Sequence, residues 1–195
     1  MSETPSAARR SERARSAILA ATTELIREMP YAKLGIEAIA ARAGVGKQTI
    51  YRWWPSKGAV VLDAMLERDS SPEGLVLPDS GDIRADLTLL LRGAVAELTD
   101  PAVEGFLRAM YIEIQQDPDI GRYYRERLLL PQRAAVAARL AAAVEAGQLR
   151  PDLDTEIALD LLLGPIQSRW SLGLDGLTEE YADAILAAAL AHLTP

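Results

Sequence analysis

The stretch IAARAGVGKQTIYRWWPSK, residues 39–57, decides the fold of this chain. Apolar residues at helical spacing stand on both sides of Gly44, so the stretch predicts two short helices joined by a tight turn. Glycine suits the left-handed end of a helix, where most other residues cost about 1 kcal/mol. Val45 then fills the space between the helices, while Ile50 and Trp54 fall on the inner face of the second. This pattern is typical of a helix-turn-helix.

Polar side chains crowd the outer side of the second helix. The first residues of a helix that enters the major groove of DNA reach the base edges, so we expect Lys47 and Gln48 to read bases. Other side chains of the segment, with a basic arm before it, are expected to hold phosphates: Thr49, Tyr51, Trp53, Lys57, Arg9, Arg10 and Arg13. The alternative is an ordinary pair of helices whose polar face is only solvated, because short motifs also match by chance.

The flanking segments complete a small domain. Apolar residues between Arg10 and Met29 recur at helical spacing and predict one buried stripe. Pro55 ends the second helix of the motif, and Ser56 can cap a further helix. Residues 1–10 are rich in Ser, Thr, Pro and Ala, and we expect them to be a disordered basic arm in the absence of DNA.

Residues 11–66 resemble the DNA-binding domain of the TetR family of bacterial transcriptional regulators. The matching words are ILAA (18–21), EAIA (37–40), AGV (43–45) and TIY (49–51) leading to PSK (55–57). The resemblance implies a three-helix DNA-binding domain, a linking fourth helix, and an all-helical ligand-binding and dimerisation domain behind it. Gly35 stands where the family usually has Thr or Ser, so a hydroxyl contact to phosphate is absent at that position.

Composition limits the possible classes of protein. The chain has 195 residues, no cysteine, a net charge of −7 and 49% hydrophobic residues, which fits one or two domains without disulfides or thiolate metal sites. No apolar run is long enough to cross a bilayer, and no signal-peptide pattern is present. We therefore expect a cytoplasmic protein without membrane contact, associated with the nucleoid when bound to DNA.

Charge is divided unevenly along the chain. Residues 1–70 hold 11 Lys and Arg against 8 Asp and Glu, a net charge of +3. Residues 71–195 hold 10 against 20, a net charge of −10. The division fits a cationic head that meets phosphate and an acidic body that does not, although two halves can also differ by chance.

Every segment after the loop at residues 70–81 has helical periodicity, and none alternates as a strand does. The expected helices are Asp82–Leu98, Pro101–Gln116, Pro118–Gly147 with a break near Pro131, Asp154–Gly173 and Thr178–Leu193. The sequence therefore predicts an all-α fold of about nine helices. Its expected parts are the arm (1–10), a helix-turn-helix DNA-binding domain (11–71) and a helical ligand-binding and dimerisation domain (72–195).

The last two expected helices carry a stripe of small and apolar residues that suits a homodimer. Small residues let helices approach closely, and two helices from each subunit can form a four-helix interface. The expected interface residues are Leu161, Gly164, Pro165, Ser168, Leu172, Tyr181, Ala184, Ala188 and Ala191. The alternative is that both helices belong to the core of a monomer.

The acidic half also holds candidates for a small-molecule pocket. A pocket needs an apolar lining with a few polar groups, which these residues can supply: Phe106, Met110, Tyr111, Tyr123, Tyr124, Gln167 and Trp170. Aromatic residues at helical spacing are, however, more often core than pocket.

Catalysis has little support. His192 is the one histidine, and no Gly-rich phosphate loop, HExxH pair or GxSxG elbow occurs. The acidic pairs at residues 117/119 and 152/154 stand at helix starts, where capping explains them better than acid–base or metal chemistry. We expect neither an enzyme, nor a cofactor, nor a metal site.

The combined expectation is a homodimeric transcriptional regulator that binds a palindromic DNA operator. A repressor released by a small-molecule effector is the favoured form, and an activator with the same fold is an alternative. A helical small-molecule binding protein with an incidental helix-turn-helix is the alternative from another class.

Overall fold

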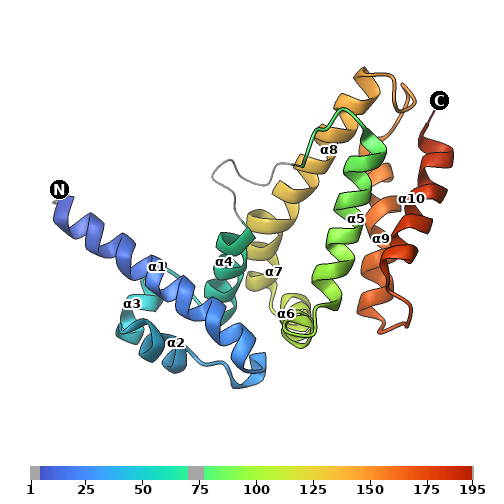
Figure 1. The fold of residues 1–195 in the computed structure, drawn as a ribbon. Helices are drawn as coiled ribbons and strands as arrows, with labels where there is room; N and C mark the ends of the chain where they lie inside the picture. The colour runs from blue at the N-terminus through green and yellow to red at the C-terminus, as the bar shows by residue number, and fades with distance from the viewer. Residues whose placement is uncertain (1–4, 70–76, 195) are drawn as a thin grey trace. The chain divides into compact units, whose positions relative to one another are not determined.

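The protein is helical throughout the part that the computed structural model describes, residues 5–69 and 77–194 (Figure 1). Side chains are described from residue 11 to 67 and from 77 to 194. Within these ranges no strand occurs, and no helix is both long enough and apolar enough to span a membrane.

The elements follow one another along the chain without long irregular segments between the described helices. Their bounds are α1 Pro5–Glu28, the 3-10 turn Tyr31–Lys33, α2 Ile36–Ala43, α3 Lys47–Tyr51, α4 Lys57–Asp69, α5 Ile83–Thr99, α6 Glu104–Gln116, α7 Pro118–Tyr124, α8 Leu130–Glu145, α9 Thr155–Ser171 and α10 Glu179–Leu193. A π-helical segment, Arg125–Leu129, joins α7 to α8, so that the helix continues from one to the other. With α7 and α8 taken as one interrupted helix, the described chain agrees with the about nine helices expected.

The chain forms two compact units. The first unit contains α1 to α4 together with Gly105–Glu126, and the second contains α5 and the helices from α8 onward. The segment Gly105–Glu126 thus packs with the amino-terminal helices, whereas the sequence-based division at residue 72 assigned it to the carboxy-terminal domain. Helix α1 begins at Pro5, inside the segment expected to be a disordered arm.

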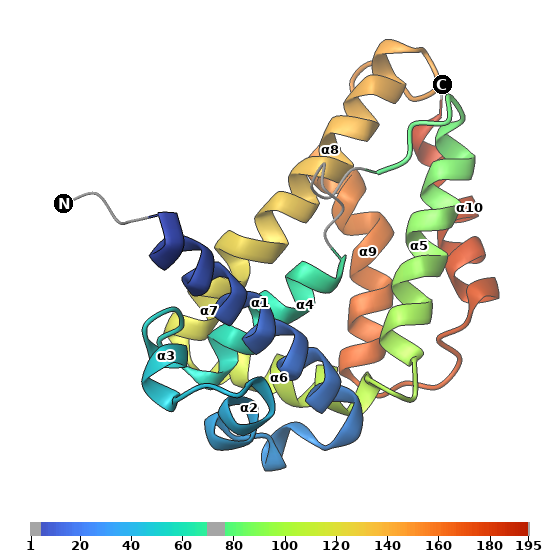
Figure 2. The ribbon, with the colours of Figure 1, turned by 60° about the vertical axis from the view of Figure 1, so that its left-hand side comes forward.

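In the first unit α1 packs against α2, α3 and α4, and α4 packs against α7 (Figure 2). The approach of α4 to α6 and α7 is close at Gly58. A Cβ atom there would lie 2.8 Å from Ile120 Cδ1 and 3.1 Å from Glu113 Oε1. The Ser56 hydroxyl accepts a hydrogen bond from the Ala59 N–H across 3.2 Å, which confirms the predicted cap of α4.

In the second unit α5, α8, α9 and α10 enclose an apolar core. Its fully buried side chains include Leu87, Leu91, Leu140, Leu159 and Leu162. Helix α10 packs against α5 and α9, and α9 also packs against α8.

Helix starts in both units are capped by acidic or hydroxyl side chains, as the acidic pairs in the sequence indicate. Asp117 accepts hydrogen bonds from the N–H groups of Asp119 and Ile120, and Asp154 accepts from those of Glu156 and Ile157. Two further helices begin in the same way, at Asp82 and Thr178. These side chains satisfy N–H groups that a helix leaves without internal partners.

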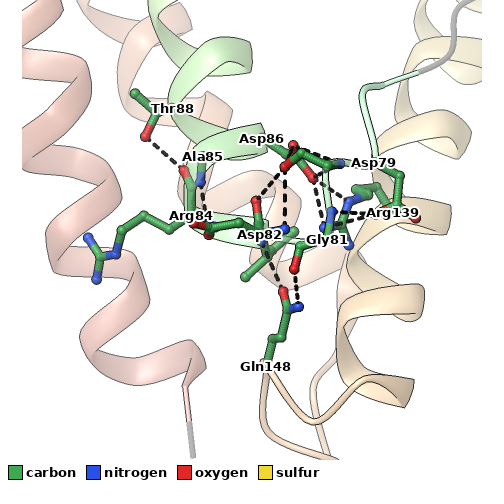
Figure 3. Close-up of polar contacts among 11 residues, drawn as sticks. Asp79, Gly81, Asp82, Arg84, Ala85, Asp86, Thr88, Arg139 and Gln148 are labelled. Carbon is green, nitrogen blue, oxygen red and sulfur yellow. Dashed lines mark hydrogen bonds and ion pairs between the residues drawn. The ribbon is translucent and has the colours of Figure 1, made fainter.

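A polar cluster fixes the start of α5 to α8 (Figure 3). Arg139 and Asp86 are 6% and 1% exposed, and Arg139 Nε donates to Asp86 Oδ2 across 2.7 Å. The Ser80 hydroxyl donates to Asp86 Oδ1 across 2.6 Å. The Gln148 side chain accepts from the Ile83 N–H and donates to the Gly81 carbonyl. The segment before α5 is therefore held to the second unit by buried polar contacts.

Candidate nucleic-acid interface

The turn between α2 and α3 has the conformation that its glycine predicts. Gly44 ends α2 with a φ of 66°, and its N–H donates to the carbonyls of Ala40 and Ala41. The Val45 N–H donates to the Ala40 carbonyl across 3.0 Å. A Cβ atom at Gly44 would meet nothing within 4 Å, so the left-handed backbone alone favours glycine there.

Helix α3 has one buried face and one exposed face. Ile50 and Trp54, on and just after the helix, are 0% and 1% exposed, whereas Tyr51 and Trp53 are 54% and 37% exposed. The remaining polar residues predicted to contact DNA on α3 are exposed, except for a half-buried Thr49: Lys47, Gln48 and Thr49. The inner residues hold α3 to the unit, and the outer residues leave its polar side accessible to a partner.

Lys47, the first residue of α3, is engaged with its neighbour α2. Its ammonium group forms an ion pair with the Glu37 carboxylate, and the two side chains are 52% and 68% exposed. The hydrogen bond from Lys47 lowers the pKa of Glu37. Sequence reasoning missed this pair, although Glu37 stands in one of the matching words. A predicted base-reading side chain is thus partnered by an anion in the protein without DNA.

Lys57 lies against an aromatic ring. Its Nζ is 3.6 Å from the centroid of the Tyr31 ring and donates to the Tyr31 carbonyl across 3.3 Å. Burial lowers the pKa of Lys57. The Tyr31 ring in turn packs edge-on against Phe106 of α6, with 5.1 Å between the ring centroids. The charge predicted to hold a phosphate therefore sits on an aromatic surface at the start of α4.

The basic arm is described only in part. Arg13 is exposed on α1. The side chains of Arg9 and Arg10 lie outside the described residues. Arg42 of α2 pairs with Glu24 and Glu28 of α1, across 3.0 Å and 2.6 Å, so this arginine joins two helices of the unit.

A buried carboxylate behind α3 is a further feature that sequence reasoning missed. Asp63 of α4 is 6% exposed and accepts from the Trp54 indole N–H across 2.8 Å. It also accepts from the Tyr123 hydroxyl of α7 across 2.8 Å, and the guanidinium of Arg15 lies 3.8 Å away. A lone aspartate in an apolar helix word is the one signal in the sequence that could have indicated such a contact.

The predicted pocket residues are divided between the two units. Phe106, Met110, Tyr111, Tyr123 and Tyr124 belong to the first, and the other two, Gln167 and Trp170, belong to the second. Phe106 and Met110 are buried in the first unit, and Tyr123 is bonded to Asp63 as described above. Within the first unit these side chains serve packing, which was the bland alternative for them.

The predicted dimer residues share one property in the second unit. All of them lie outside its core, being exposed or, at Pro165 and Tyr181, half-buried: Leu161, Gly164, Pro165, Ser168, Leu172, Tyr181, Ala184, Ala188 and Ala191. Two large apolar side chains among them, Leu161 and Leu172, are 50% and 69% exposed. The stripe therefore does not form part of the core of this chain, as the monomer alternative required.

Among the described residues no group of His, Cys, Asp and Glu has an arrangement that could hold a metal ion.

Comparison with known proteins agrees with this geometry. Residues 18–64 match the family of bacterial regulatory proteins called the tetR family, and residues 77–189 match the tetracyclin repressor-like C-terminal domain. Together the two matches span the helix-turn-helix and most of the helices that follow it.

Individual relatives cover most of the chain. It is 32% identical to the uncharacterized HTH-type transcriptional regulator YdeS of Bacillus subtilis (strain 168), over 88% of this chain and 85% of that protein. It is 28% identical to the DNA-binding transcriptional repressor TetR of Mycobacteroides abscessus, over 84% of this chain and 85% of that one. The crystal structure of the TetR family transcription regulator SCO0332 is similar with a TM-score of 0.81 and 34% identity, over 93% of this chain and 99% of that one. The matches confirm the expected all-helical fold and the expectation of a regulator rather than an enzyme. On these grounds the chain belongs to the TetR family of bacterial helix-turn-helix transcriptional regulators.

Proposed function

We propose that this regulator is a repressor that binds a palindromic operator as a homodimer. The observation that carries the proposal is the division of α3 into a buried face, at Ile50, and an accessible polar face that begins at Lys47 and Gln48. The similarity to a protein named as a DNA-binding transcriptional repressor supports the repressor role. As a regulator of bacterial genes it would act in the cytoplasm, at the nucleoid.

Two recognition helices of a dimer would enter successive major grooves about 34 Å apart on one face of the duplex. Lys47 suits the acceptor atoms of guanine, and Gln48 suits the edge of adenine. Phosphate contacts are assigned to the surrounding side chains: Thr49, Tyr51, Trp53, Lys57, Arg9, Arg10 and Arg13. These contacts would fix the position of the protein on DNA without reading its sequence.

The test separates base reading from phosphate binding. Duplexes selected from a random pool by the wild-type protein are titrated with variants over a range of salt concentrations. Lys47→Ala or Gln48→Ala should cost about 1–3 kcal/mol per half-site and relax the preference at particular base pairs. Lys57→Ala should weaken binding to all sequences alike and lower the salt slope by about 1 per subunit. If both Lys47→Ala and Gln48→Ala keep the wild-type base preferences, α3 is not the reading helix.

We propose that the exposed stripe on α9 and α10 forms the homodimer interface. Large apolar patches on a soluble surface are uncommon without a partner, and Leu161 and Leu172 are both at least half exposed. The small residues between them, Gly164 and Ser168, allow a second pair of helices to approach closely. A two-fold dimer uses the same surface on both copies, which this continuous stripe permits.

We further propose that a small-molecule effector binds the carboxy-terminal helical region and releases the operator. A ligand shifts a protein between two states only through its different affinity for each state. Linkage therefore requires that bound operator weaken the ligand by the same factor by which the ligand weakens the operator. A compound found by thermal-shift screening should show this reciprocity in calorimetry with and without operator. Equal ligand affinity in both titrations would contradict release by this route.

A further inference from the structure

One buried carboxylate joins the end of the recognition segment to a helix far away in sequence. The two oxygens of Asp63 accept from different elements: Oδ2 from the Trp54 indole and Oδ1 from the Tyr123 hydroxyl, each across 2.8 Å. Arg15 Nη2 of α1 lies 3.8 Å from Oδ2. All four residues belong to the first unit, so one side chain of α4 contacts α1, α7 and the residue that follows the recognition helix.

Helix α3 depends on such contacts for its orientation. It spans only Lys47–Tyr51, and a helix so short is not stable on its own backbone hydrogen bonds. Its orientation is therefore set by the residues on its inner side, of which Ile50 and Trp54 are 0% and 1% exposed. Trp54 is the only one of these two with a polar group, and that group is bonded to Asp63.

The bonds to Asp63 are not readily exchanged for water. A buried carboxylate that loses a donor remains desolvated and without full compensation, which is more costly than losing a bond at the surface. Hydrogen bonds to an ionised acceptor are also stronger and more directional than neutral ones. A displacement of Trp54 relative to α4 or α7 would thus have to break or bend one of these bonds.

We propose that Asp63 is a positioning residue for the recognition helix, and that Tyr123 contributes to DNA reading through it. The inference rests on the proposed function, in which α3 contacts the operator. Sequence-independent binding comes from phosphate contacts spread over the surface, whereas base reading requires the helix to be placed accurately in the groove. Loss of positioning should therefore reduce discrimination between sequences, and leave general DNA affinity nearly unchanged.

The experiment compares two duplexes of equal length at one salt concentration: a sequence selected by the wild-type dimer and a scrambled version of it. Tyr123→Phe removes one hydroxyl, and Asp63→Asn keeps the size of the side chain but replaces one acceptor by an amide. Each should weaken binding to the selected duplex by about tenfold, the equivalent of one hydrogen bond to a charged group. Binding to the scrambled duplex should stay within about twofold of the wild type, because phosphate contacts remain.

Asp86→Asn is the matched control. Asp86 is also a buried carboxylate with an arginine partner, but it lies in the second unit. This variant should lower the melting temperature and keep the wild-type ratio of affinities for the two duplexes. A merely structural role of Asp63 would give the same pattern, so the ratio distinguishes positioning from stability.

A double-mutant cycle tests the route through Asp63. If Trp54 and Tyr123 act through one carboxylate, Trp54→Phe and Tyr123→Phe should be non-additive, and the double variant should lose less than the product of the single losses. Tyr123→Phe decides alone if Asp63→Asn does not fold. Unchanged discrimination in the folded variants, or equal losses on both duplexes, would overturn the inference while the wild type still discriminates. A wild type that binds both duplexes equally would overturn the proposed function and this inference with it.

Discussion

Replacing Arg139 by methionine should destabilise the second unit strongly, because it leaves a buried carboxylate without its cation. Arg139 is 6% exposed and its partner Asp86 is 1% exposed, with 2.7 Å between Nε and Oδ2. Removing one member of a buried pair typically costs about 3–5 kcal/mol. The Ser80 hydroxyl continues to donate to Asp86 across 2.6 Å, so we expect about 3 kcal/mol, the lower end of that range. For a chain of this size the melting temperature should then fall by about 6–12 °C.

The assay is thermal unfolding of Arg139→Met followed by circular dichroism at several pH values. Burial acts to raise the pKa of Asp86, and the hydrogen bonds from Ser80 and Arg139 hold it below its ordinary value. Without Arg139 the effect of burial should prevail and raise this pKa. The carboxyl of the variant then takes up a proton as the pH falls, so the loss of stability should be largest at neutral pH and shrink in acid.

Arg92→Met is the control for that measurement. Arg92 also pairs with a carboxylate across α5 and α10, at 2.6 Å from Asp183, but both side chains are 43% exposed. Exposed pairs contribute little to stability, so this variant should melt close to the wild type. A fall of less than about 3 °C for Arg139→Met, or a fall that is constant from neutral to acid pH, would refute the reasoning.

Three further predictions follow from single positions. Gly44→Ala should lower the free energy of unfolding by about 1 kcal/mol, because its φ is 66°. Gly93→Ala, the same change on an exposed part of α5, should raise it by about 0.5–1 kcal/mol; equal signs in denaturant titrations would contradict the conformational argument. Burial, and then Asp117, raise the pKa of Glu113, so the folded state holds that proton more tightly and loses this stability as the pH rises through the raised value. Glu113→Gln should therefore melt above the wild type at neutral pH and equal it well below pH 4.5, the ordinary value; a lower melting temperature at neutral pH would count against a raised pKa. Gly164→Arg places a charge in the proposed dimer contact, and sedimentation should show monomers; a variant that stays dimeric would place the interface elsewhere.

Features set by local chemistry could be predicted from the sequence. The end of α2 at Gly44 depends on one backbone conformation that glycine adopts without strain. The starts of α4, α5 and α9 depend on Ser56, Asp82 and Asp154, whose side chains accept bonds from N–H groups two or three residues ahead. In such cases the cause and the effect lie within one turn of helix.

Features set by distant partners could not be predicted. Periodicity shows that one face of α6 is buried but does not show which helix covers it, so Gly105–Glu126 was assigned to the wrong side of the domain division. The bond between Asp63 and Tyr123 joins residues 60 positions apart, and nothing in either neighbourhood indicates the other. Tyr123 was read as a pocket residue because an aromatic side chain in an apolar helix looks the same in either role.

Exposure is what separates the two readings of α9 and α10. The sequence shows small residues at helical spacing, which suit a core as well as an interface. The described structure fills the core with another set of residues from the same helices, among them Leu162, Ile166 and Leu186. The expected interface residues are left on the outer side, and this observation could not be made from spacing alone.

Lys47 is the residue for which the structure adds most to the sequence hypothesis. In the protein without DNA its ammonium donates to Glu37, so a guanine must compete with this carboxylate. Both side chains are more than half exposed, and salt and water weaken such a pair, so the competition should be modest. Glu37→Gln should therefore strengthen binding to the selected duplex by about two- to fivefold. The gain should disappear when Lys47 is already alanine, if Glu37 acts by holding Lys47. A gain that persists with Lys47→Ala would instead mean that Glu37 repels DNA directly, and that Lys47 is not the side chain it controls.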